Sequence, residues 1–292
     1  MRPNLRDVTV CAADTVAPQL AARALERCLD RADFGDAILF SDRSVPGRFR
    51  NVAIAAMPSI EAYSNFCLTG MPRHIATDFA LVVQWDGYVV HPEAWNNDFR
   101  QYDYIGAPYR RRDGTPVMGN GGFSWRSRKL LQALAWLSPE RGVPEDVMIC
   151  LRQRGRFETE FGIRYAPEAA ARRFCHDVEQ PAVGTFGFHG ARNFLRYEDE
   201  RTVIAIFEQA PAAVFLTGSF LHLMLIAAGQ KATLATGVAL YRIARRYYPQ
   251  NRLAKAMSSD WRPERAGRNV ALLERYMREQ DVMSGYGSRH PR

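Results

Sequence analysis

Three continuous apolar runs in the first 86 residues constrain the fold, because a helical pattern separates each run from the next. The runs are DVTVCAA (7–13), AILFSD (37–42) and DFALVVQWD (78–86). Continuous rather than alternating apolar residues are typical of strands that are covered on both faces. Residues 19–30 and 59–70, which lie between the runs, have apolar side chains at helical spacing. The order predicts an α/β fold with a mixed, mainly parallel sheet and right-handed connections.

The elements beyond residue 86 are less regular. We expect strands at YVV (88–90) and YDYIGAP (102–108), with a helical turn opened by Pro92 between them. GNGGFS (119–124) predicts a glycine-rich turn, and an amphipathic helix follows it to about residue 137. Pro144 opens a predicted helix over residues 144–162, because proline suits the start of a helix. Residues 163–190 are expected to be loop-rich.

The charge distribution divides the chain into two parts. Residues 1–200 contain 25 Lys+Arg and 25 Asp+Glu, whereas residues 201–292 contain 14 and 6, which is the whole net charge of +8. We therefore expect an α/β domain over 1–200 and a basic helical region over 201–292, which holds a weakly tetratricopeptide-like helical hairpin and ends in a flexible tail. The basic region suits either an anionic surface, such as a membrane face or an acidic polymer, or a solvated helix face.

The stretch between Glu208 and Lys231 has 22 residues without a formal charge, close to the length of a membrane span. A buried helix, an interfacial helix and a span are all open, and we favour the buried helix because Pro211 and His222 dilute the stretch. The N-terminus lacks the apolar core of a signal peptide. The five cysteines lack metal-site spacing, which predicts reduced thiols in a cytoplasmic protein, free or at the inner face of the membrane. The charge-neutral first 200 residues argue against nucleic acid as a partner.

Four short stretches contain the residues best suited to chemistry. They are QWDG (84–87), GNGGFS (119–124), PEDV (144–147) and FGFHG (186–190). Each has a purely structural interpretation when it is taken alone. An aspartate or an acidic pair can cap a helix, glycines can form a turn, and a histidine can serve the core.

Together and in this order, the four stretches resemble the GT-A class of nucleotide-sugar glycosyltransferases. In particular they resemble a bacterial and fungal family of GT-A-like domains that is usually described as of unknown function. The resemblance runs from about Val8 to Asn193 and leaves out the C-terminal third. It implies a Rossmann-like nucleotide-diphospho-sugar transferase fold. It also implies transfer of a sugar from a nucleotide-sugar, such as a UDP-sugar, to a hydroxyl of a glycan or lipid-linked acceptor. Polysaccharide synthesis is the implied setting.

The resemblance also implies a divalent metal ion that neutralises charge on the leaving diphosphate. Asp86 corresponds to the last residue of the Asp-x-Asp motif of the class, and His189 would be the second protein ligand. Oxygen ligands suit Mg²⁺ or Mn²⁺, and the imidazole shifts the preference to Mn²⁺. The frame here is Gln84-Trp85-Asp86, so an amide replaces the first acid. Gln84 is expected to hydrogen-bond the ribose or a metal-bound water.

The remaining site residues follow from the same resemblance. Asp146 would be the general base of an inverting reaction, and Glu145 would hold acceptor or donor hydroxyls. If this acidic pair only caps a helix, a retaining reaction stays open. Further residues are expected to contact the nucleotide (Asp14, Thr15, Asp42, Asp78, Gln84 and Trp85) or the sugar and acceptor (Gly121, Gly122, Phe123 and Ser124), with Phe123 or Trp125 as an apolar platform. The arginine run 110–112 would meet the diphosphate or an anionic acceptor, or form a solvated loop.

A second hypothesis is a catalytically silent sugar- or nucleotide-binding module, whose helical C-terminus docks a partner or a membrane. The glutamine at position 84 favours this module, because it removes one of the two acids of the motif. The presence of Asp86, Asp146 and His189 together favours the enzyme.

Overall fold

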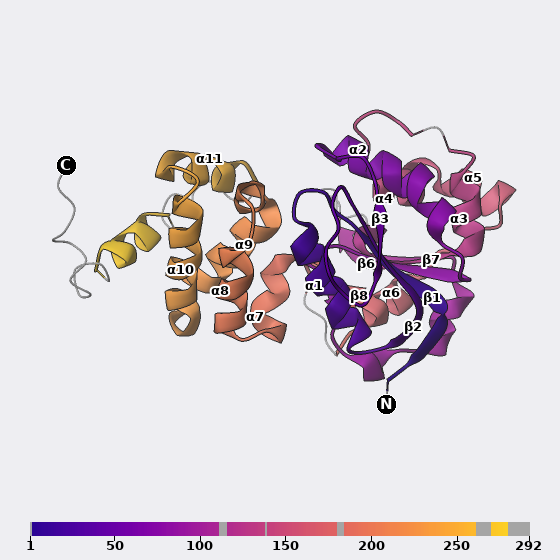
Figure 1. Ribbon diagram of the computed structural model, residues 1–292, viewed down its shortest axis with the longest axis horizontal. Helices are drawn as coiled ribbons and strands as arrows, with labels where there is room; N and C mark the ends of the chain where they lie inside the picture. The colour runs from indigo at the N-terminus through magenta and orange to yellow at the C-terminus, as the bar shows by residue number, and fades with distance from the viewer. Residues whose placement is uncertain (1, 111–115, 138, 180–183, 261–269, 280–292) are drawn as a thin grey trace. The chain divides into compact units, whose positions relative to one another are not determined.

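The computed structural model describes residues 2–110, 116–137, 139–179, 184–260 and 270–279 (Figure 1). The chain divides into two compact units, Met1–Gly190 and Ala191–Arg292. The division falls before the boundary that we expected after residue 200. The arginine run at 110–112 and the tail from residue 283 lie outside the residues whose side chains are described.

A six-stranded sheet in the order β3-β2-β1-β4-β7-β6 forms the centre of the first unit. β1, β2, β3 and β4 are mutually parallel, and only β7 runs antiparallel to its neighbours β4 and β6. The predicted mixed, mainly parallel sheet flanked by helices is therefore confirmed. The strands are β1 (Asn4–Ala13), β2 (Asp33–Ser41), β3 (Arg50–Ala53), β4 (Phe79–Val83), β6 (Tyr104–Arg110) and β7 (Pro116–Ser127).

The three apolar runs form the adjacent strands β2, β1 and β4. Cys11 of β1 pairs with Ile38 of β2 and with Val82 of β4, and all three side chains are buried. Because the three strands are parallel, their carboxyl ends meet at one edge of the sheet, where α/β proteins bind ligands. β3 was not predicted, since its sequence RNVA has no apolar run and lies largely exposed at the sheet edge.

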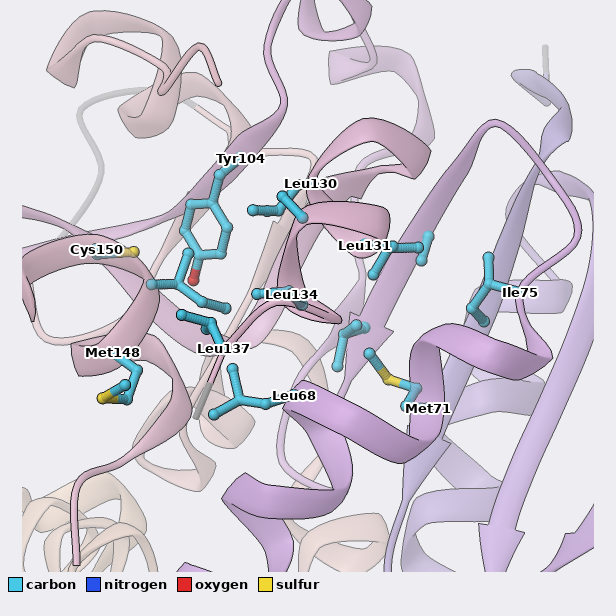
Figure 2. Close-up of a cluster of buried hydrophobic side chains, with 14 of the residues drawn as sticks. Leu68, Met71, Ile75, Tyr104, Leu130, Leu131, Leu134, Leu137, Met148 and Cys150 are labelled. Carbon is cyan, nitrogen blue, oxygen red and sulfur yellow. The ribbon is translucent and has the colours of Figure 1, made fainter. Parts of the chain in front are cut away.

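Helices cover the sheet. α1 (Pro18–Leu29) matches the predicted helix and buries its apolar side. The other helical segments are α2 (Ile60–Asn65), the π-helix η1 (Phe66–Gly70), η2 (Met71–His74), α3 (Arg128–Leu134), α4 (Glu145–Val147), the π-helix η5 (Met148–Arg152), α5 (Arg154–Glu160) and α6 (Glu168–Phe174). Figure 2 shows Leu68 and Met71 packed in one apolar cluster with Leu131, Leu134 and Met148.

Two predicted helices are interrupted, and one helix was missed. The helix expected over 59–70 changes to π geometry at Phe66, and the one expected over 144–162 does so at Met148. In the second case Met148, Ile149 and Cys150 are all buried. Three consecutive inward side chains do not fit the one-sided apolar stripe of a regular surface helix. α6 lies in the region that we expected to be loop-rich.

A small second sheet joins segments that are about 100 residues apart in the sequence. β5 (Tyr88–Val89) pairs antiparallel with β9 (Gly187–Phe188), and β8 (Cys175–His176) pairs parallel with β9. The rings of Tyr88 and Phe188 meet edge to face, with centroids 4.7 Å apart. This sheet brings the residues just before β5 close to those just after β9. The predicted turn at Pro92 forms η3 (Pro92–Ala94) and is followed by η4 (Asn97–Gln101).

The described elements of the second unit are all helical, as predicted for residues 201–292. Its segments are η6 (Ala191–Asn193), α7 (Phe194–Tyr197), α8 (Glu200–Glu208), η7 (Ala212–Leu216), α9 (Gly218–Ala228), η8 (Lys231–Thr233), α10 (Leu234–Arg245), α11 (Gln250–Asp260) and a helix over 270–279. Where the chain is described, no helix alone has the length and apolarity of a membrane span. Only α9 taken together with Lys231–Arg245 does, with a 110° bend between them.

Candidate active site

The glycine-rich stretch GNGGFS is not a turn, because it lies inside β7. β6 pairs Ile105 with Trp125 and Ala107 with Asn120, so residues 121–124 of β7 bulge out of register with β6. On the other side of β7, Val83 of β4 stays paired with Phe123. The backbone N–H of Gln84 donates to the carbonyl of Gly122 at 2.9 Å. The bulge therefore places the glycines beside the residues that follow β4.

The glycines of the bulge are needed because other side chains occupy the space of a Cβ. A Cβ at Gly121 would lie 2.4 Å from Glu145 Oε1, and one at Gly122 would lie 2.2 Å from His189 Nε2. The predicted contact of these glycines with sugar hydroxyls stays a prediction. What the structure shows is that they admit an acidic side chain and an imidazole.

We expect Gly122→Ala to lower the free energy of unfolding by about 1–3 kcal/mol, since the added methyl overpacks the site. Among the described residues, no atom outside the neighbouring helix backbone lies within 4 Å of the Cβ position of Gly155 in α5. Gly155→Ala is therefore the matched control and should be neutral or slightly stabilising. Urea unfolding of both variants measures the difference. Equal stability of Gly122→Ala and the wild type would show that His189 is free to move away.

Asp86, His189 and Gln84 meet at the carboxyl end of β4. The Nε2 atom of His189 lies 3.3 Å from Asp86 Oδ1 and 3.1 Å from Gln84 Oε1. The amide of Gln84 is oriented by Tyr63, because Gln84 Nε2 donates to Tyr63 Oη at 2.9 Å. The carboxylate of Asp86 is 5% exposed and the imidazole of His189 is 16% exposed. Asp86 and His189, the two predicted metal ligands, therefore lie next to each other in the structure.

The other imidazole nitrogen of His189 faces a carboxylate that sequence reasoning missed. His189 Nδ1 lies 3.4 Å from Asp177 Oδ2, and the same oxygen accepts a hydrogen bond from Asn120 Nδ2 at 2.7 Å. A signal was present in FCHD (174–177), where a short strand is followed directly by an aspartate. It was too short to recognise, since β8 has two residues.

These carboxylates determine the protonation of His189. Burial alone would lower the pKa of His189, but attraction to Asp86 and the hydrogen bond to Asp177 raise the pKa to about 10. The folded protein therefore holds this proton more tightly than the unfolded chain does. The resulting stability is complete below about pH 6.5 and is lost as the pH rises toward about 10.

We accordingly expect the metal-free wild type to lose more unfolding free energy than His189→Gln does between pH 6.5 and 10. The difference should be at most about 4 kcal/mol. Urea unfolding of both proteins in EDTA across this range measures it, and the variant serves as the control for all other titrating groups. Parallel pH profiles would contradict the proximity of His189 to Asp86 and Asp177.

The donor set fits a hard or borderline divalent cation. A carboxylate oxygen of Asp86 and the amide oxygen of Gln84 lie 3.3 and 3.1 Å from the imidazole nitrogen His189 Nε2, and Mn²⁺ or Mg²⁺ accepts such ligands. Asp177 on Nδ1 matches the carboxylate–histidine arrangement that orients metal-binding imidazoles. Among the described residues, no group of three or more His, Cys, Asp or Glu side chains is arranged to hold a metal ion. A bound ion would therefore take further ligands from the substrate or water.

Asp146 lies at the start of α4 and lines a pocket of about 390 Å³. The pocket is bordered by Tyr109, Asn120, Asp146, Asp177, Val178 and Glu179. The backbone N–H groups of Val147 and Gly121 donate to the Asp146 carboxylate at 2.8 and 3.4 Å. Burial nevertheless raises the pKa of Asp146, against the effect of these two hydrogen bonds. Asp177 therefore lies between this pocket and His189.

The Glu145 side chain also borders Gly121, but it is buried and has a different partner from Asp146. Its carboxylate lies 3.5 Å from Arg126 Nη2, and both side chains are almost completely buried. Burial raises the pKa of Glu145, while the guanidinium of Arg126 opposes this shift. The hypothesis that Glu145 holds substrate hydroxyls is corrected on this ground, because its carboxylate is engaged with Arg126.

The predicted apolar platform is also corrected. Phe123, Ser124 and Trp125 have no exposed surface, since they belong to the strand β7 rather than to a turn. The ring of Phe123 packs against Phe174 and Phe186. The Ser124 hydroxyl donates to the carbonyl of Gly121 at 2.9 Å. None of the three is placed to meet a sugar.

The predicted nucleotide contacts divide between the two ends of the sheet. Asp14, Thr15 and Asp42 follow β1 and β2 at the carboxyl edge, as expected, and Trp85 lies partly exposed beside Asp86. Asp14 Oδ1 accepts hydrogen bonds from the backbone of Val16 and Ala17.

Asp78 does not join these residues. It precedes β4, at the opposite end of the strand from Asp86, and its side chain is 76% exposed beside Arg128. Its proposed contact with the nucleotide is corrected, because a strand of five residues separates Asp78 from the site.

Comparison with known proteins gives one family match. Residues 47–189, which include Asp86, Asp146 and His189, match a family described as a protein of unknown function (DUF5672). No curated protein matches the chain.

Several solved structures are similar to the chain. One is a glycosyltransferase involved in the glycosylation of the major capsid of PBCV-1, with 12% identity and a TM-score of 0.40, covering 62% of this chain and 91% of that one. The glycosyltransferase GlyE of Streptococcus pneumoniae TIGR4 has 16% identity and a TM-score of 0.35, covering 54% and 44%. S. aureus TarS 1–349 has 11% identity and a TM-score of 0.37, covering 99% and 93%. Such identities and TM-scores carry no information about activity.

Proposed function

We propose that this protein is a metal-dependent glycosyltransferase that moves a sugar from a nucleotide-sugar donor to a hydroxyl acceptor with inversion. One observation carries the proposal. Asp86, Asp146 and His189 lie far apart in the sequence, yet the bulge of β7 and the β5–β9 pairing bring them to one edge of the sheet. Two neighbouring glycines lie between these side chains. The N–H of Gly121 donates to Asp146, and Gly122 borders His189, whose Nε2 lies 3.3 Å from Asp86.

Asp146 is the general base in this proposal. Its carboxylate takes the proton from the acceptor hydroxyl while that oxygen bonds to the anomeric carbon of the donor. The bond from the anomeric carbon to the diphosphate breaks, and its electron pair leaves with the diphosphate. The burial that raises the pKa of Asp146 makes its carboxylate a stronger base than an exposed one. The pocket beside Asp146 is where the acceptor would bind.

Asp86 and His189 would hold the metal ion, with Gln84 beside them. When bound, the ion would neutralise negative charge on the leaving diphosphate. Two protein ligands with one formal charge form a weak site alone, so metal and donor are expected to bind together. UDP-GlcNAc, which is bound in a structure of S. aureus TarS, is one member of the proposed donor class. The proposal does not rest on that likeness.

A thermal-shift panel of UDP-, GDP- and CMP-sugars, each with and without Mn²⁺, tests the proposal. We expect one nucleotide class to raise the melting temperature, and to do so only with Mn²⁺. A rise that is independent of metal and without any donor turnover would favour the catalytically silent binding module. The absence of any shift would contradict nucleotide-sugar binding. Contact of the basic helical unit with a membrane or a protein, and a cytoplasmic location, stay predictions.

A further inference from the structure

A line of hydrogen bonds runs from the backbone of β7 to the imidazole of His189. The N–H of Gly122 donates to Asn120 Oδ1 at 2.8 Å. This bond fixes which end of the Asn120 amide faces Asp177, so that Asn120 Nδ2 donates to Asp177 Oδ2 at 2.7 Å. The same carboxylate oxygen lies 3.4 Å from His189 Nδ1. The residues come from β7, from the end of β8 and from the end of β9.

We propose that Asn120 and Asp177 are positioning residues, which hold the imidazole of His189 so that its Nε2 faces Asp86 and Gln84. The metal-binding consequence of this rests on the proposed function, whereas the ring orientation does not. A ring nitrogen must lose its proton before it can serve as a metal ligand, and a hydrogen bond at the other nitrogen decides which of the two does so. By accepting from Nδ1–H, Asp177 keeps that nitrogen protonated, so that Nε2 is the nitrogen that can give up its proton beside Asp86 and Gln84.

Because the Asp177 carboxylate is buried, it needs the hydrogen bonds that Asn120 and His189 provide. The Asp177 side chain is 6% exposed, and a buried carboxylate is costly unless hydrogen bonds and opposite charge compensate it. Asn120 and His189 supply both. Because Asn120 is itself held by the β7 backbone, Asp177 keeps its orientation before any ligand binds. Preorganisation of this kind is what a metal-binding imidazole requires from the groups around it.

The first test measures Mn²⁺ binding in the presence of UDP, and separately of GDP, by the electron paramagnetic resonance of free Mn²⁺. Asp177→Ala should raise the dissociation constant by about 10–100-fold. Asp177→Asn should cost less, because an amide oxygen can accept both hydrogen bonds. In the His189→Ala background, Asp177→Ala should have no further effect. An undiminished effect there would make Asp177 a direct ligand and overturn its positioning role, as would wild-type affinity of Asp177→Ala.

Asp103→Asn is the matched control, because Asp103 is also a buried carboxylate of the first unit. It accepts hydrogen bonds from the Ser127 hydroxyl at 2.6 Å and the Arg164 backbone at 2.8 Å, away from the site. Its substitution should alter stability and leave the Mn²⁺ dissociation constant unchanged. A similar loss of Mn²⁺ affinity in this control would mean that any buried carboxylate has the same effect, which would overturn the specific role of Asp177.

The second test needs no metal and no donor. In the metal-free protein, the Nδ1–H proton of His189 should give a slowly exchanging nuclear magnetic resonance signal that is identified by its loss in His189→Gln. We expect it in the wild type, in Asp103→Asn and in Asp177→Asn, and expect faster exchange in Asn120→Ala. Loss in Asp177→Ala supports the proposal, and its retention there overturns it. If the wild type binds no Mn²⁺ with UDP or with GDP, the proposed metal–diphosphate site fails while this signal still decides the role of Asp177.

Discussion

Replacing Asp146 with asparagine is expected to lower the turnover number for sugar transfer by about 10²–10⁴-fold, the range that positioned acid–base groups contribute. The amide has nearly the same shape as the carboxylate but cannot take the acceptor proton. The bond from the Val147 backbone, at 2.8 Å, can persist to the amide oxygen. The fold and the binding of the nucleotide-sugar should therefore survive. Steady-state kinetics with saturating donor and acceptor measure the effect.

Glu145→Gln is the matched control, because the two acids are adjacent but only Asp146 lines the pocket. The Glu145 carboxylate pairs with Arg126 in the core, so its loss leaves a buried guanidinium uncompensated and should cost about 3–5 kcal/mol of stability. Turnover per folded molecule should fall far less than in Asp146→Asn. Near-normal turnover of Asp146→Asn, under conditions where the chemical step limits the rate, would rule out Asp146 as the base.

Asp86→Ala is expected to lower kcat/KM by at least about 10²–10³-fold, which is the usual cost of losing one group that stabilises developing negative charge. Of the two groups at His189 Nε2, Asp86 and Gln84, only Asp86 carries a formal negative charge. The variant should also lose the Mn²⁺-dependent rise in melting temperature with the donor. Donor kinetics and thermal shift together distinguish lost binding from an unfolded protein.

Asp78→Ala is the control for Asp86→Ala, since the two aspartates flank β4 at its opposite ends. Asp78 is exposed, so its loss should leave kcat/KM within about twofold, as is usual for surface positions. A comparable loss in both variants would contradict the placement of the site at the carboxyl edge of the sheet.

The sheet could be predicted wherever burial left a local pattern in the sequence. β1, β2 and β4 were recognised because strands covered on both faces require unbroken apolar runs. β3 was missed, because an edge strand pairs through its backbone and its four residues are partly or fully exposed. The π segments at Phe66 and Met148 were also missed, since they depend on which consecutive side chains the core accepts.

The glycine stretch shows why a local rule failed in β7. Glycine favours turns, and GNGGFS was interpreted that way. Gly121 and Gly122 instead allow side chains from elsewhere in the sequence to approach the strand. That requirement comes from Glu145 and His189, which no local pattern connects to residues 121 and 122. The prediction that Phe123 offers a platform to a sugar failed for the same reason, because the position of Phe123 inside a buried strand was not recognised.

The candidate site was predicted where an acid or a histidine stood in a recognisable motif. Asp86, Asp146 and His189 belong to such motifs, whereas Asp177, Asn120 and Tyr63 act through contacts that only the fold creates. Asn120 lies within GNGGFS, yet its role depends on the distant Asp177. The orientation of Glu145 toward Arg126 was equally invisible, since PEDV shows two acids and not their directions.

The most direct measurement of the central claim is the release of nucleoside diphosphate from the UDP- or GDP-sugar selected by the thermal-shift panel, in Mn²⁺ and in EDTA. The wild type should release it with Mn²⁺ and an acceptor, and lose this activity in EDTA. Asp86→Ala and His189→Ala should remain inactive in Mn²⁺, while Asp78→Ala should match the wild type. Equal release by the wild type in EDTA and in Mn²⁺, with Asp86→Ala as active as the wild type, would contradict a metal–diphosphate site built from Asp86 and His189.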